Sequence, residues 1–122
     1  MDNNIKGLFV TYEIALKLKE KGFNEQCLAF FNGVGDDMLQ PIDTDFINFR
    51  EIGECVAAPL WQQVFTWFRD VHDIDINIET GGLPKMYVVF VKDWIYENEK
   101  DRALFTYEDA QEQAILKALE LI

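Results

Sequence analysis

The chain has 122 residues, of which 22 are acidic and 11 basic, so its formal net charge near neutral pH is −11. Hydrophobic residues make up 49% of the sequence and aromatic residues 14%, which excludes a disordered acidic tail. The charge argues against direct binding of nucleic acid or of anionic membrane surfaces, because both require clustered Lys and Arg. A chain of this length can bury its own core, so we expect a single domain over residues 1–122, with residues 1–6 flexible.

The longest apolar stretch, Met86–Val91, is far shorter than the roughly 18 residues of a membrane-spanning helix. The first residues do not follow the pattern of a signal peptide, which has a basic region and then an apolar one. We therefore expect a cytoplasmic protein without a membrane partner. Cys27 and Cys55 lack paired spacing and are expected to be reduced.

The first expected helix covers residues 12–21. Thr11 is a typical N-cap residue, because its hydroxyl can accept a hydrogen bond from an amide of the first turn. Gly22 is expected in the left-handed conformation just beyond the helix, with Phe23 contacting Leu18.

A β-hairpin is expected next. Residues 27–31 form its first strand, Asn32-Gly33 a two-residue turn, and residues 38–41 the return strand. The intervening Asp36 and Asp37 lie near two glycines, but the Lys and the following helix of a phosphate-binding loop are missing. Residues 43–54 predict either a short third strand or a loop that packs on the core.

Pro59 predicts the first position of a second helix, since a missing amide proton costs nothing there. Helical spacing gives it a wide apolar face, and Phe65 lies off this face. The apolar positions are Ala57, Leu60, Trp61, Val64, Trp67, Phe68 and Val71. Residues 73–79 then alternate strictly, which predicts a strand with three Ile toward the core and polar side chains toward solvent.

Residues 80–84 predict a turn, and residues 86–91 a second strand, apolar on both faces, that pairs antiparallel with the first. Residues 94–96 either extend this sheet or begin another strand. Thr106 predicts the start of the last helix, with Asp109 completing a capping box. The order α-β-β-(β)-α-β-β-α indicates an α+β fold, in which three helices pack on an antiparallel sheet of about four strands.

No pattern identifies a metal or cofactor site. Asp73, Asp75 and Asn77 match the first ligands of an EF-hand loop, but the required Gly and Glu are replaced by Ile78 and Pro84. No zinc-ligand spacing involves the single histidine. We therefore expect no bound metal and no cofactor. The candidates for general acid–base catalysis are Asp36, Asp37, His72 and Asp75.

Two hypotheses of function remain open. The first is a non-enzymatic intracellular binding or accessory protein that acts through protein–protein contacts, in its sharper form an acidic inhibitor of a basic partner. Exposed aromatic residues would then favour a partner or a homodimer. The candidate binding residues are Trp61, Phe65, Asp73, Asp75, Glu79 and Trp94. The second hypothesis is a small enzyme or ligand-binding domain whose acidic site is dispersed along the sequence.

Three parts of the sequence carry a resemblance to other proteins: residues 11–18 with 21–25, residues 59–63 with 67–69, and Tyr107-Glu108 with Ala110 and Ala114. Together they resemble small acidic proteins of unassigned function encoded by gut bacteria and by their phage-like or mobile elements. The resemblance implies a small intracellular α+β protein. It implies no activity, catalytic residue or cofactor.

Overall fold

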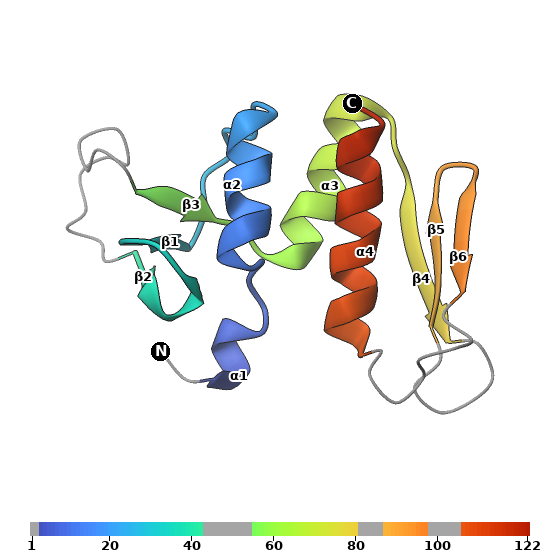
Figure 1. Ribbon diagram of the computed structural model, residues 1–122. Coiled ribbons are helices and arrows are strands. Elements are labelled where there is room, and N and C mark those ends of the chain that lie inside the picture. Colours follow the sequence, from blue (N-terminus) through green and yellow to red (C-terminus); the bar gives the residue numbers. More distant parts are fainter. Residues whose placement is uncertain (1–2, 43–54, 81–86, 98–105) are drawn as a thin grey trace. The chain divides into compact units, whose positions relative to one another are not determined.

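A computed structural model of the protein describes residues 3–42, 55–80, 87–97 and 106–122 (Figure 1). These residues form an α+β structure with four α-helices and two antiparallel sheets of three strands each, in place of one sheet of about four strands. The chain divides into two compact units, Met1–Gln63 and Val64–Ile122, and the division falls within helix α3. That residues 1–122 form one domain stays a prediction.

The first unit begins with two helices. Residues 3–6, which the sequence predicts to be flexible, form the short helix α1 (Asn3–Lys6), and α2 covers Tyr12–Glu20. The Thr11 hydroxyl accepts a hydrogen bond from the Ile14 amide, as predicted. Gly22 has a φ of 91°, and the Phe23 amide donates to the Leu18 carbonyl. The predicted start and end of α2 are therefore confirmed.

The first sheet consists of β1 (Ala29–Phe31), β2 (Leu39–Pro41) and β3 (Val56–Ala58), in the order β2-β1-β3. The predicted two-residue turn is wrong, because the Asn32 amide donates to the Met38 carbonyl and the connection contains a short 3-10 helix, η1 (Asp36–Met38). The strand or loop predicted within residues 43–54 lies outside the described residues. Strand β3 follows that segment and pairs with β1.

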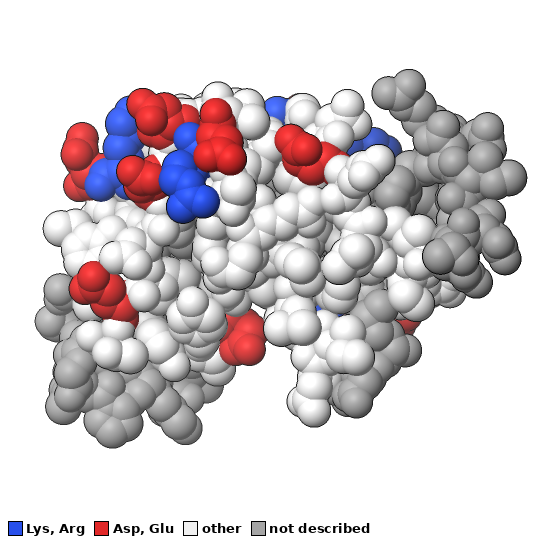
Figure 2. Space-filling model, turned by 180° about the vertical axis from the view of Figure 1, so that it is seen from behind, with Lys and Arg blue, Asp and Glu red and all other residues white. Residues whose placement is uncertain are grey.

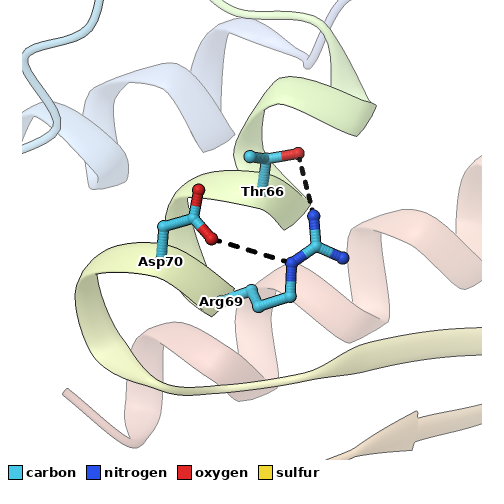
Figure 3. A network of polar contacts seen from close by, with 3 residues as sticks. All are labelled: Thr66, Arg69 and Asp70. Carbon is cyan, nitrogen blue, oxygen red and sulfur yellow. Dashed lines mark hydrogen bonds and ion pairs between the residues drawn. The ribbon is translucent and has the colours of Figure 1, made fainter.

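Helix α3 (Trp61–His72) begins two residues after Pro59 rather than at it. The Pro59 carbonyl accepts a hydrogen bond from the Val10 amide, and the Trp61 amide donates to the Leu8 carbonyl. Val64, Trp67 and Phe68 are buried as the spacing predicts, whereas the Val71 side chain is 57% exposed. On the exposed surface of α3, Arg69 contacts both Thr66 and Asp70 (Figure 3).

The second unit contains the sheet β4 (Ile76–Thr80), β5 (Tyr87–Val91) and β6 (Trp94–Glu97), in that order, and the final helix α4 (Tyr107–Glu120). The predicted capping box between Thr106 and Asp109 is confirmed. Helix α4 packs against β4 and β5 (Figure 1). Its buried residues are Ala110, Gln111, Ala114, Ile115, Ala118 and Leu119.

Strand β4 begins three residues later than the alternating pattern predicts. Asp73 has a φ of 56°, in the left-handed region, and therefore does not continue the strand. Ile74 is buried, and its amide donates to the Phe68 carbonyl. Residues 73 and 74 thus close α3, and the alternation serves a strand only from Ile76 onward.

Candidate functional site

The structure distributes the predicted site residues between its two units. Asp36, Asp37 and Trp61 belong to the first unit. The second unit holds the other candidates, namely Phe65, His72, Asp73, Asp75, Glu79 and Trp94.

The Asp36 carboxylate lies at the N-terminus of α2. Its Oδ1 accepts a hydrogen bond of 2.7 Å from the Tyr12 amide, 24 residues earlier in the chain. The first amides of a helix lack partners within the helix, and its dipole favours a negative charge at this end. The Tyr12 ring packs edge-on against Phe31 of β1, with ring centroids 5.4 Å apart. These contacts give Asp36 a structural role, joining the η1 loop to α2.

We expect Asp36→Ala to lower the free energy of unfolding by about 1 kcal/mol, since the Tyr12 amide loses its acceptor. The neighbouring Asp37→Ala is the matched control, because it removes the same charge from the same exposed loop. Urea unfolding followed by circular dichroism measures both. Equal losses in the two variants would mean that the Asp36 hydrogen bond contributes nothing.

His72 lies in the last turn of α3, where its ring packs edge-on against Trp67 with centroids 4.6 Å apart. Its Nε2 atom is buried, and no described residue offers it a hydrogen bond. A general acid or base must reach the substrate directly or through one water molecule. The buried Nε2 is therefore poorly placed for acid–base catalysis in this conformation.

Both cysteines are free thiols. Cys27 is buried, and this burial raises the pKa of its thiol to about 12, although a hydrogen bond with the Gln63 side chain acts in the opposite direction. A nucleophilic cysteine needs a lowered pKa, so Cys27 does not have the properties of one. Cys55 is half-buried, with its Sγ 3.6 Å from Oδ1 of Asn32.

The three candidate aromatic residues have different surroundings. Trp61 is only 5% exposed, and its indole nitrogen donates to the Gly7 carbonyl. Phe65 is half-buried on α3. Trp94 is half-buried on β6, and the Lys117 ammonium lies 5.4 Å from the centre of its ring. Trp61 therefore offers little surface to a partner.

The register of the second sheet defines two faces. Val89 and Val91 are fully buried and share one face with Ile76, Ile78 and the aromatic residues Tyr87 and Trp94. The Tyr87 ring contacts Tyr107 of α4, so this is the face that α4 covers. Successive residues of a strand point to opposite faces. The outer face consequently belongs to Asn77, Glu79, Val88, Phe90 and Ile95.

Three apolar residues lie next to one another on this outer face. Phe90 is paired across the strands with Ile95, and Val88 is two residues from Phe90 on β5. Ile95 is 60% exposed, while Val88 and Phe90 are half-buried. We call these three residues the outer apolar cluster. The sequence signal for it is that residues 86–91 are apolar on both faces while residues 73–79 alternate, but the pattern alone does not show which face α4 covers.

Among the described strands of this sheet, β4 lies at one edge. The Lys92 amide donates to the Asp75 carbonyl, which places residues 75, 77 and 79 among the hydrogen-bonded positions facing β5. The N–H and C=O groups of Ile76, Ile78 and Thr80 therefore point away from β5. Asn77 and Glu79 are exposed beside this edge, and the Asn77 side chain donates to the Glu79 carboxylate.

Acidic and basic residues lie together on one face of the molecule. Figure 2 shows one face of the molecule, on which Lys and Arg side chains lie among Asp and Glu. By sequence, the first unit holds 10 acidic and 5 basic residues and the second holds 12 and 6, so both units are acidic. A surface that imitates nucleic acid would be uniformly acidic, and the face in Figure 2 is not.

In the described part of the chain, no cluster of three or more His, Cys, Asp or Glu side chains could hold a metal ion. Likewise, none of the helices in those residues is long and apolar enough to cross a membrane. Comparisons with protein families, with curated proteins and with solved structures found no match to this chain.

Proposed function

We propose that this protein binds another protein through the outer face of its second sheet and acts without catalysing a reaction itself. The observation that carries the proposal is the outer apolar cluster of Val88, Phe90 and Ile95, which lies on the face opposite to α4. An antiparallel sheet with one face packed on a core usually has a polar second face. Apolar side chains gathered on that second face are typical of an interaction surface.

The residues that could act as general acids or bases favour catalysis less than the outer apolar cluster favours protein binding. The Asp36 carboxylate is engaged by the Tyr12 amide, and Nε2 of His72 is buried. Asp75 is exposed just before β4, the strand at one edge of the described sheet. It is therefore better placed to contact a partner than to work in a site shielded from water.

Ile95→Ser tests the proposal, and Val71→Ser on α3 is its matched control because the two side chains are 60% and 57% exposed. Tagged full-length protein of each kind is used to recover partners from a lysate of the source cell, with quantification by mass spectrometry. We expect Ile95→Ser to reduce recovery of a specific protein about tenfold, while Val71→Ser leaves it unchanged. Identical recovery with both variants and with the parent chain would contradict the proposal.

Light scattering on the same proteins tests self-association through this face. We expect the parent chain and Ile95→Ser to have the same mass. A dimer of the parent chain that Ile95→Ser dissociates would show that the outer apolar cluster binds a second copy rather than a different protein.

A further inference from the structure

We infer that the free edge of β4 accepts an extended segment of a basic protein as a fourth, antiparallel strand. This inference rests on the proposed function and adds to it the chemistry of the partner. Its basis is the backbone of Ile76, Ile78 and Thr80, whose outward N–H and C=O groups have no backbone partner among the described residues. Such an edge pairs readily with another strand.

The side chains along β4 define what the added strand must carry. Asp75, Asn77 and Glu79 are exposed on the outer face, and they lie opposite every second residue of an added strand. Lys or Arg at those positions would pair with the two carboxylates. The alternate positions would lie beside Ile76 and Ile78, which are half-buried on the face covered by α4, and would therefore be apolar.

A second copy of this chain does not satisfy these requirements. An antiparallel pairing of two β4 strands centred on Asn77 places Asp75 opposite Glu79 of the second copy at both ends. In the register centred on Glu79 the two Glu79 carboxylates lie opposite each other, and in the register centred on Ile78 each Glu79 lies opposite Asn77. In none of these registers does the second β4 offer a Lys or Arg, because Ile76–Thr80 contains neither. Like charges in directly opposed positions destabilise a sheet. Two β4 strands thus leave these carboxylates without a basic partner, whereas a basic strand supplies one.

Lys92 does not remove this preference. It lies opposite Asp75 on the side of β5, not on the free edge, and among the described residues no ion pair joins it to Asp75. Asp73, just before β4, adds a further exposed carboxylate. Three exposed acidic residues, Asp73, Asp75 and Glu79, therefore lie along or just before β4.

The inference is tested with a synthetic seven-residue peptide, Lys-Val-Lys-Val-Lys-Val-Lys with blocked ends, added to the full-length protein at low salt. Hydrogen exchange measured by NMR gives the sharpest readout. We expect the peptide to slow exchange of the Ile76, Ile78 and Thr80 amides at least tenfold, and to leave the Asn77 and Glu79 amides unchanged because they already bond to β5. Protection of neither set would overturn the inference.

Two controls separate strand addition from simple charge attraction. The same peptide with N-methyl groups on alternate amides keeps its charge but cannot form the ladder, and we expect it to bind at least tenfold more weakly. The double variant Asp75→Asn, Glu79→Gln should weaken binding of the unmodified peptide about tenfold. Glu108→Gln, Glu120→Gln on α4 removes two exposed charges from the other side of the sheet and should leave binding within about twofold.

Equal binding of the methylated and unmodified peptides, or equal weakening by the two double variants, would overturn strand addition. These results are independent of the lysate experiment with Ile95→Ser. A partner recovered there while the peptide fails would leave the proposed function standing and reject the edge of β4 as its site. In that case the carboxylates of β4 serve only to keep the edge from pairing.

Discussion

Phe68→Ala is expected to lower the free energy of unfolding by about 3–5 kcal/mol, the usual cost of removing a fully buried phenyl ring. Phe68 lies on α3 with a fully buried side chain, and its ring contacts Trp67 edge-on with centroids 5.0 Å apart. The Phe68 carbonyl also accepts a hydrogen bond from the Ile74 amide, just beyond the end of the helix. The loss combines the transfer of the ring to water with the cavity left behind. Urea unfolding followed by circular dichroism measures it.

Phe65→Ala is the matched control, because it makes the same change one turn earlier on the same helix. Phe65 is only half-buried, so less apolar surface leaves the core when it is truncated. We expect a loss of about half that of Phe68→Ala or less. Similar losses would show that the two rings are equally packed, contrary to the burial described above.

Cys27 should resist alkylation in the native protein by roughly a thousandfold relative to an ordinary thiol. With a pKa of about 12 against the usual 9.0, the reactive thiolate is about a thousand times rarer near neutral pH. Iodoacetamide should therefore modify the native chain at Cys55 and the urea-unfolded chain at both cysteines, as read by peptide mass spectrometry. Rapid modification of Cys27 in the native state would contradict its burial.

The same shift predicts how stability depends on pH. The pKa of Cys27 is higher in the folded state, mainly because burial disfavours the thiolate. Its contribution to stability is therefore complete below pH 9.0 and is lost as the pH rises toward about 12. Over this range Cys27→Ala should lose less stability than the parent chain, since it lacks the titrating group. Urea midpoints near pH 8 and near pH 10.5 test this, and parallel declines would reject it.

The parts of the fold that were predicted correctly depend on local interactions. Thr11 marks the start of α2 and Gly22 follows its end, and both act through contacts with residues a few positions away. The capping box at the start of α4 likewise joins residues only three positions apart. The prediction of a two-residue turn at Asn32-Gly33 was wrong. The connection between β1 and β2 is longer, and Asp36 within it accepts a hydrogen bond from the Tyr12 amide, which is distant in sequence. The spacing of nearby residues does not predict such a contact.

Strand pairing explains the error in the number of sheets. Short apolar runs predict strands, but they do not show which strand lies beside which. Here β3 pairs with β1 in the first unit, whereas β4, β5 and β6 pair among themselves in the second. The start of β4 was misplaced for a related reason, because Ile74 fits the alternation and is used instead to close α3.

The candidate site was predictable in part. The exposure of Asp75 and Glu79 follows from the alternating pattern, since one face of a half-buried strand must meet water. That β4 is an edge strand, and that Phe90 and Ile95 are neighbours on the outer face, depend on the order and register of the sheet. The sequence of a single strand predicts neither its position in the sheet nor its neighbours.

The placement of the three tryptophans gives the protein built-in fluorescent reporters. Trp61 is anchored to Gly7 in the first unit, whereas Trp67 and Trp94 belong to the second. Trp67 is enclosed beside His72, and Trp94 is half-exposed beside Lys117. Variants that keep one tryptophan at a time would therefore emit from distinct environments. Their emission during denaturation would show whether the two units lose their structure together or in sequence.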